Sequence, residues 1–297
     1  MNIFMSFWSQ GFRAGQINID FWKLSLALAR KHYKDVHLVT DIKGKELLKQ
    51  LPFKSIRVDL EDLKDINSGK IWSLGKIYTY NKIADEGPFM HLDSDVFLWE
   101  KLPEDLLKSQ IFAQSLDMPL YSDYNNLIFD RAYDLNFLKI ISRGQIPQDW
   151  QELIISRKII PIYNVGILGG QNFNFFKKYS EYSLEMVKDK RFKELFESEF
   201  HHSVYGDAVL ANSCCLEQLN LSLFNSKNDN LFISTLLKDM QDSDNRSFKK
   251  YTHLLRAKNN QTVIDSIRMR VKSEPYILDI DQSVSLKTWR GERDSLS

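Results

Sequence analysis

A short, mostly apolar segment that is interrupted by two carboxylates is the feature that most constrains how this chain can fold. The segment Phe89–Leu92 is followed by Asp93 and Asp95, and the apolar pattern resumes at Val96. A run of this kind is typical of a buried strand in the middle of a sheet. Ionised side chains are costly to bury without partners. The strand is therefore expected to end at the edge of a sheet, where the two acidic side chains can leave the core.

The spacing of the two aspartates indicates a metal site. Side chains two positions apart project to the same side of an extended segment, so the carboxylates of Asp93 and Asp95 would repel each other. A divalent cation removes that cost, and Mg²⁺ and Mn²⁺ prefer hard oxygen ligands. The same letters recur at Asp242–Asp244 inside a polar run that is typical of a loop, and Asp279–Asp281 lies close to the C-terminus. Only the pair at 93 and 95 has apolar sequence on both sides, so the metal site is predicted there.

Length and composition favour an ordinary globular α/β protein. The 297 residues suffice for one large domain or two small ones. With 40 basic and 39 acidic residues the net charge is +1, so no overall field would attract nucleic acid. Cys214 and Cys215 are adjacent and form neither a disulfide framework nor a zinc pattern, so a cytoplasmic location is expected. We expect no leader peptide and no transmembrane segment, and peripheral contact with a membrane stays open.

Strands and helices alternate through the first part of the chain. Expected strands cover residues 2–8, 36–40, 55–58 and 89–92, and expected helices cover 17–33, 46–51 and 70–84. This alternation predicts a mostly parallel sheet with helices on both faces. Ligands of such sheets bind beyond the carboxyl ends of the strands, and Ser9, Asp41, Asp93 and Asp95 would all lie on that edge. Asp41 would either contact a base or ribose there, or cap a helix.

A second informative segment, Ile159–Gly170, is an expected strand that contains Asn164 and Gly166. A glycine inside a strand marks a bulge or the close approach of a ligand to the backbone. The amide of Asn164 could bind a polyhydroxylated ligand, or it could simply belong to a turn. An edge strand is expected at Ile111–Gln114. The segment 103–150 is expected to recognise the acceptor, because binding determinants favour loops.

The last part of the chain offers three further candidates. Asp207 lies near the start of an expected helix, 204–219, where it would cap the helix or point at a substrate. His253 is followed by Lys258, and an imidazole with a nearby lysine can supply a metal ligand and a counter-charge for phosphate. The segment 225–250 is polar and is expected to be a connection. Helices are also expected at 172–187 and 262–271.

Taken together, these features resemble the GT-A class of nucleotide-sugar glycosyltransferases, and within it the family-8 and family-32 types and related bacterial proteins. The resemblance covers about residues 1–260. It rests on the Leu74–Tyr80 helix before the Asp-x-Asp strand, on Tyr163–Ile167, which looks like the Phe-Asn-Ser-Gly strand of the family, and on His253 with Lys258. The spacing from His253 to Lys258 is one residue shorter than in family 8 and lacks its glycine.

The resemblance implies an α/β fold of GT-A type, with a Rossmann-like, mostly parallel central sheet. It implies a hexosyltransferase-like enzyme that uses Mn²⁺ or Mg²⁺ to move a sugar, with retention, from a nucleoside-diphosphate sugar to an unknown acceptor. A UDP-sugar is the favoured donor, and the acceptor would be a glycan, a lipid-linked sugar, a protein or a small molecule. The single domain would comprise a donor-binding half (1–100), an acceptor-binding and catalytic half (101–260), and a C-terminal helix and tail (261–297).

The resemblance also implies roles for individual residues. The metal would be bound directly by Asp95 and His253. Asp93 would bind the metal through water, or would bind the ribose and sugar hydroxyls. The residues that bind the donor would be Phe7, Trp8, Asp41, Lys76, Asp93, Ser94, Gly166 and Lys258. The catalytic residues would be Asp207, Asn164 and Lys76.

Two other functions stay open. Leu92–Val96 also fits the nucleophile loop of a haloacid-dehalogenase-type phosphotransferase, in which one aspartate attacks phosphate and the next is the acid or base. That superfamily usually places this loop near the N-terminus and requires a second acid four residues after a Gly-Asp, whereas Asp207 is followed there by Ala211. The second alternative is a catalytically inactive protein that binds nucleotide sugars. An EF-hand is excluded because Val96, Phe97 and Leu98 replace its later oxygen ligands.

Overall fold

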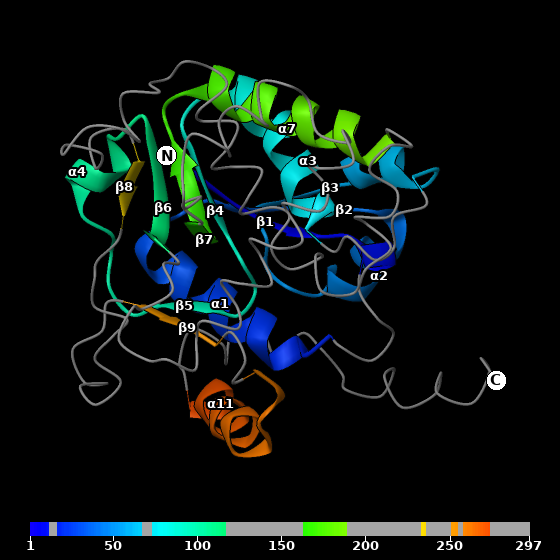
Figure 1. Cartoon of the computed structure of the whole chain (residues 1–297). Helices are drawn as coiled ribbons and strands as arrows, with labels where there is room; N and C mark the ends of the chain where they lie inside the picture. The colour runs from blue at the N-terminus through cyan, green and yellow to red at the C-terminus, as the bar shows by residue number, and fades with distance from the viewer. Residues whose placement is uncertain are drawn as a thin grey trace, which may run out of the picture.

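A seven-stranded sheet forms the centre of the computed structural model, which describes residues 1–11, 17–66, 73–116, 163–188, 233–235, 251–254 and 258–273 (Figure 1). The strand order is β3-β2-β1-β4-β7-β6-β8. The strands are β1 (Asn2–Phe7), β2 (Val36–Thr40), β3 (Ser55–Arg57), β4 (Phe89–Leu92), β6 (Ile111–Leu116), β7 (Tyr163–Gly170) and β8 (Ile233–Thr235). Only the β4–β7 and β6–β7 pairs are antiparallel, so β7 alone among these strands runs against the others.

Helices cover both faces of this sheet. Figure 1 shows α1 (Ile19–His32) on one side and α3 (Leu74–Ile83) with α7 (Phe173–Lys188) on the other. The shorter elements are α2 (Ile42–Leu48), α4 (Glu104–Leu107), η1 (Ser9–Gly11), η2 (Asp59–Leu63) and η3 (Ala84–Glu86). The predicted fold class, an α/β fold with a mostly parallel central sheet and helices on both faces, is confirmed.

The face toward α1 is built by alternate residues of β1. Ile3, Met5 and Phe7 are buried in one core cluster with Trp22 and Leu26 of the helix. Successive strand residues point to opposite faces, so these three residues of β1 share one face of the sheet. Each such side chain stabilises the fold by about 1.5–3 kcal/mol when it is fully buried.

The opposite face carries an aromatic cluster. The ring of Tyr80 from α3 stacks on Phe89 of β4 with centroids 6.1 Å apart, and Phe176 of α7 lies 4.7 Å from Phe89. Ser180 Oγ donates a hydrogen bond of 2.8 Å to the carbonyl of Ile77, which joins α7 to α3. Much of the high aromatic content therefore belongs to the core, where ring pairs add to the hydrophobic contribution.

A two-stranded sheet connects the middle of the chain to its end. Its strands, β5 (Val96–Leu98) and β9 (Tyr251–His253), pair antiparallel, and α11 (Gln261–Ser273) follows. Phe97, Leu254 and Ile267 are buried in one apolar cluster with Leu24 and Leu28 of α1. This packing fixes β9 next to the segment that leaves β4. It therefore brings residues far apart in the sequence to one place.

The structure corrects several element predictions. The edge-strand prediction for β6 is wrong, because β6 lies between β7 and β8. The strand β8 falls within 225–250, which was expected to be a polar connection. The helix expected at 46–51 begins earlier, at Ile42, because Asp41 caps it. The expected helix at 204–219 lies outside the described residues, and the predicted domain boundaries stay predictions.

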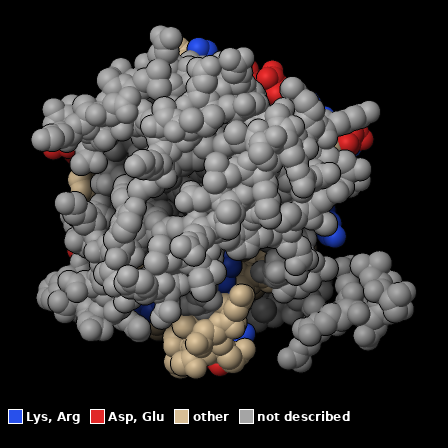
Figure 2. Space-filling model, viewed as in Figure 1, with Lys and Arg blue, Asp and Glu red and all other residues tan. Residues whose placement is uncertain are grey.

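Both acidic and basic side chains of the described residues are visible, as scattered groups, in the view of Figure 2. Among the described residues, no helix is long and apolar enough to cross a membrane.

Candidate functional site

The segment that leaves β4 forms a tight turn at the carboxyl edge of the sheet. The turn contains Asp93, Ser94 and Asp95, and it closes with a hydrogen bond of 3.1 Å from the amide of Val96 to the carbonyl of Asp93. The amide of Asp93 donates to the carbonyl of Gly166 at 2.9 Å, which ties the turn to β7. The backbone of this turn is therefore held before any ligand is bound.

A buried serine of α1 holds the same turn from the other side. Ser25 Oγ donates to the carbonyl of Val96 at 2.7 Å and lies 3.4 Å from the carbonyl of Asp93. A hydroxyl inside a helix usually bonds to its own backbone or to water. Here it bonds to a different segment, so it positions the two aspartates.

Asp95 is buried at the inner side of this turn and has two basic neighbours, an imidazole and an ammonium. Its Oδ1 lies 3.4 Å from Nε2 of His253, and its Oδ2 lies 3.4 Å from Nζ of Lys258. Burial alone would raise the pKa of Asp95, but the imidazole of His253 and the ammonium of Lys258 outweigh burial and hold the pKa well below its usual range. Asp95 is therefore an anion in the folded protein, as a metal ligand has to be.

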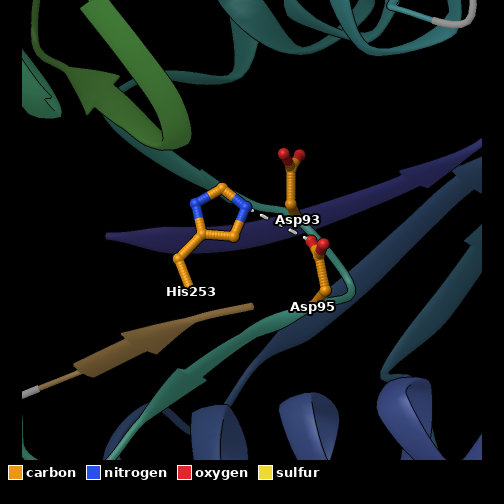
Figure 3. A group of neighbouring side chains, drawn as sticks. All are labelled: Asp93, Asp95 and His253. Atoms are coloured by element: carbon orange, nitrogen blue, oxygen red, sulfur yellow. Dashed lines mark ion pairs between the residues drawn. The ribbon is translucent and has the colours of Figure 1, made fainter. Parts of the chain in front are cut away.

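His253 reaches Asp95 through the small second sheet. In the β5–β9 ladder, Val96 is the partner of His253, and the amide of Leu254 donates to the carbonyl of Asp95 at 3.1 Å. Figure 3 shows the imidazole of His253 turned toward the carboxylate of Asp95, with Asp93 on the neighbouring side. The other ring nitrogen, Nδ1, lies 2.9 Å from Oε1 of Gln114 on β6.

Asp93 has a different partner, Lys76, in the first turn of α3. Lys76 Nζ donates to both carboxylate oxygens of Asp93, at 2.9 and 2.8 Å, and lies 3.2 Å from the carbonyl of Val165. The lysine side chain is 7% exposed and that of Asp93 is 20% exposed, so this pair is partly shielded from water. The two aspartates of one turn thus face two separate cationic groups.

These side chains can hold a small divalent cation. Among the described residues, Asp93, Asp95 and His253 each offer a ligand atom, and these atoms lie within 4.8 Å of one another. Carboxylate oxygens with one imidazole nitrogen suit Mn²⁺ and Mg²⁺. Both oxygens of Asp93 already accept from Lys76, whereas Asp95 and His253 face each other across the gap. The donor set therefore fits a cation held mainly by Asp95 and His253.

His91 lies behind the site and is fully buried. Its Nε2 is 2.9 Å from Oγ of Ser6, and its Nδ1 is 3.8 Å from Oδ1 of Asp93. Burial, together with the positive charge of Lys76, holds the pKa of His91 well below its ordinary value. His91 is therefore neutral, and it adds no charge to the site.

Two of the predicted donor-binding residues have side chains inside the protein. The ring of Phe7 packs in the core against Trp22, with centroids 5.9 Å apart, and a contact of Phe7 with the donor stays a prediction. Trp8 is buried against α3, where a side chain at Gly75 would meet its Cβ at 2.4 Å. Both residues support the edge of the sheet from within.

For Asp41 the structure shows the helix-cap alternative. Its Oδ1 accepts from the amide of Gly44 at 2.7 Å, and its Oδ2 accepts from the amide and the hydroxyl of Ser9 at 2.9 and 2.6 Å. Both carboxylate oxygens are thus used. Asp41 joins the ends of β1 and β2 and fixes the start of α2.

The structure explains why residue 166 is a glycine. A Cβ on Gly166 would lie 2.5 Å from Cε1 of His253 and 2.6 Å from Oε1 of Gln114, so the glycine admits these two side chains. The β6–β7 register also shifts between Ala113 and Ser115, beside Gly166. Of the two alternatives for this glycine, the structure shows the bulge. The groups that lie close to the backbone of Gly166 are the side chains of His253 and Gln114.

Asn164 and Asp207 were also predicted to be site residues. Asn164 belongs to β7, and its backbone pairs with Ser115. Asp207 lies outside the described residues.

Gln114 and Ser25 were not predicted as site residues, because nothing near them in the sequence marks them. Only the fold brings them to His253 and to the aspartate turn.

Comparison with known proteins gives structural similarity at low identity. No curated protein matches the chain. The apo form of mouse xyloside xylosyltransferase 1 is 13% identical with a TM-score of 0.39, and the match covers 74% of this chain and 82% of that one. The PaToxG glycosyltransferase is also 13% identical with a TM-score of 0.42, and the match covers 77% of this chain and 74% of that one. A family model spans residues 1–277, and the chain belongs to that family, the family of unknown function DUF6734.

Proposed function

We propose that this protein is a metal-dependent glycosyltransferase that moves a sugar from a nucleoside-diphosphate sugar to an acceptor. The observation that carries the proposal is the meeting of Asp93, Asp95 and His253 within 4.8 Å at the carboxyl edge of the parallel strands. Open α/β sheets bind ligands at that edge. Lys76 and Lys258 flank the same group, and both can face an anionic ligand.

Asp95 and His253 would hold the cation directly, and Asp93 would reach it through water or bind hydroxyl groups of the donor. A bound Mn²⁺ or Mg²⁺ would supply a Lewis acid and a template for the diphosphate. Lys258 is half exposed, so its ammonium can pair with a phosphate as well as with Asp95. Negative charge on the departing nucleoside diphosphate would thus meet a positive group of the protein itself.

Lys76 would act from the opposite side, toward the sugar or a phosphate of the donor. Its ammonium fixes the carboxylate of Asp93 and lies near the backbone of β7. Asn164 of β7 and Asp207 would hold sugar hydroxyls, and the turn residue Ser94 and the backbone at Gly166 would line the donor. This side of the proposal rests on the resemblance of the motifs.

The donor base and the metal requirement can be tested together by thermal unfolding with UDP, GDP, CDP and ADP, each with Mn²⁺ or with EDTA. A ligand at 100 times its Kd stabilises the folded state by about 2.7 kcal/mol. We expect one nucleotide, UDP, to raise the melting temperature only with Mn²⁺, and Asp95→Ala to abolish the rise. Asp244→Ala is the matched control, because it alters the second Asp-Ser-Asp copy in the chain. The absence of any shift, or a shift that survives Asp95→Ala, would contradict the proposal.

Turnover separates the proposed enzyme from its alternatives. A glycosyltransferase releases UDP from a UDP-sugar with Mn²⁺, slowly to water and faster with an acceptor. An inactive nucleotide-sugar-binding protein binds the donor without releasing UDP, and a phosphotransferase instead hydrolyses a phosphomonoester. The anomeric proton signals of the first product, measured by NMR, test the proposed retention.

A further inference from the structure

The imidazole of His253 is held on three sides by groups from separate strands. Gln114 of β6 approaches Nδ1 at 2.9 Å, Asp95 approaches Nε2 at 3.4 Å, and the backbone at Gly166 of β7 lies against the ring. His253 itself comes from β9. Each contact fixes a different property of the ring, namely which nitrogen carries hydrogen, which nitrogen faces the carboxylate, and where the ring plane lies.

The contact with Gln114 decides which nitrogen carries the hydrogen. The side chain of Gln114 is completely buried, and its oxygen Oε1 faces Nδ1. A carbonyl oxygen can only accept a hydrogen bond, so the ring must donate from Nδ1. The other nitrogen, Nε2, faces the carboxylate of Asp95, which can accept its hydrogen when no cation is bound. A divalent cation that binds between them takes the place of that hydrogen.

The backbone at Gly166 makes this arrangement possible. A Cβ there would lie 2.5 Å from Cε1 of His253, 2.6 Å from Nδ1 and 2.6 Å from Oε1 of Gln114. Any other residue at 166 would therefore push apart the two groups that form the hydrogen bond. The need for glycine at this position follows from the pairing of His253 with Gln114.

We propose that Gln114 is a positioning residue, which holds Nδ1–H of His253 and turns the ring so that Nε2 is the nitrogen that binds a divalent cation together with Asp95. The inference rests on the proposed metal site, and it adds the residue that orients the imidazole ligand. Partners of this kind act through the ligand and change metal affinity by about 10–100-fold when they are removed.

The tautomer can be measured without metal, by long-range ¹H–¹⁵N NMR on protein labelled at its 6 histidines. The signals of His253 are identified by their loss in His253→Gln. In the wild type we expect hydrogen on Nδ1, where Oε1 of Gln114 accepts it. In Gln114→Met, which keeps the volume but removes the acceptor, we expect Nδ1 to lose its hydrogen and Nε2, beside Asp95, to keep one. In Gln114→Glu, which keeps an acceptor, Nδ1 should stay protonated.

Two results would overturn the inference. One is a wild-type ring without hydrogen on Nδ1, which would mean that the amide of Gln114 donates instead of accepting. The other is a Gln114→Met ring with the wild-type tautomer, which would mean that Gln114 does not control it. The wild-type spectrum needs no variant, so the first test stands even if Gln114→Met fails to fold.

Metal affinity is the second readout and separates this inference from the proposed function. With Mn²⁺ measured by electron paramagnetic resonance, we expect Gln114→Met to raise the Kd by about 10–100-fold and Gln114→Glu to change it by much less. Gly166→Ala should also weaken binding, because its methyl group displaces the imidazole. If all three variants bound Mn²⁺ with the affinity of the wild type, the positioning role would be refuted. If the wild type binds no Mn²⁺, the proposed function fails, while the tautomer measurement still decides whether Gln114 orients the ring.

Discussion

Replacing Lys76 by methionine tests how the site balances its charges. The ammonium of Lys76 donates to both oxygens of Asp93, and the lysine is 7% exposed while Asp93 is 20% exposed. Methionine keeps much of the volume but leaves the carboxylate of Asp93 without that cation. We therefore expect Lys76→Met to lose stability when no metal is present.

The magnitude follows from burial. Removing one partner of a buried ion pair costs about 3–5 kcal/mol. In Lys76→Met the group left behind is Asp93, which retains contact with water, so we expect about 3 kcal/mol, at the lower end of that range. In Asp93→Leu the group left behind is the more deeply buried ammonium, so about 4–5 kcal/mol is expected. The double variant removes both charges and should lose much less than the sum.

Urea unfolding in EDTA and in excess Mn²⁺ measures these differences. A cation can replace the charge of Lys76, so Mn²⁺ at 100 times its Kd should restore about 2.7 kcal/mol to Lys76→Met. It should stabilise Asp93→Leu less, because that variant has lost a carboxylate of the site. Additive losses in the double variant, or equal stabilisation of both single variants by Mn²⁺, would refute this account of the pair.

Three further predictions concern the support of the site. Asp41→Ala removes a helix cap and the acceptor of Ser9, so urea unfolding should show a loss of about 2 kcal/mol, whereas an unchanged midpoint would contradict the cap. Gly75→Ala gains helix propensity but places a methyl group 2.4 Å from Cβ of Trp8, so a net loss of about 1–2 kcal/mol is expected, and a more stable variant would refute it. His91 has a lowered pKa in the folded state, so the unfolded chain binds more protons below the ordinary value of 6.5. Stability should therefore fall as pH drops below that value, by at most about 1.4 kcal/mol per pH unit, and less steeply in His91→Gln; equal slopes would contradict burial of a neutral ring.

The fold was largely predictable because its main signal is local. The apolar run of β1 and the helical spacing of apolar residues in α1 identify each element from its own residues. The alternation of strands and helices then predicts parallel pairing, since such connections place a helix on a face of the sheet. The position of β6 was not predictable from its own residues, because its neighbours β7 and β8 come much later in the chain.

The site was predictable only in part, because several of its contacts join residues that are far apart in the sequence. Asp93 and Asp95 are marked by the apolar residues around them, so their sequence alone indicates the edge of a sheet. His253 was a candidate because Lys258 follows it and because the pair resembles a family motif, but its contact with Asp95 depends on the β5–β9 pairing. Gln114 and His253 are 139 positions apart, and no local pattern connects them. Long-range packing decides such contacts, and a single sequence carries no separate signal for it.

The central claim is that Asp95 and His253 form a divalent-cation site that binds a nucleoside diphosphate. Titration of Mn²⁺ into the protein with UDP, followed by the electron paramagnetic resonance signal of free Mn²⁺, tests it most directly. We predict saturable binding by the wild type and by Asp244→Ala, and a loss of affinity beyond about 100-fold in Asp95→Ala, more than removal of a supporting residue produces. Binding of Mn²⁺ by Asp95→Ala as tight as that of the wild type, or no binding by the wild type, would contradict the claim.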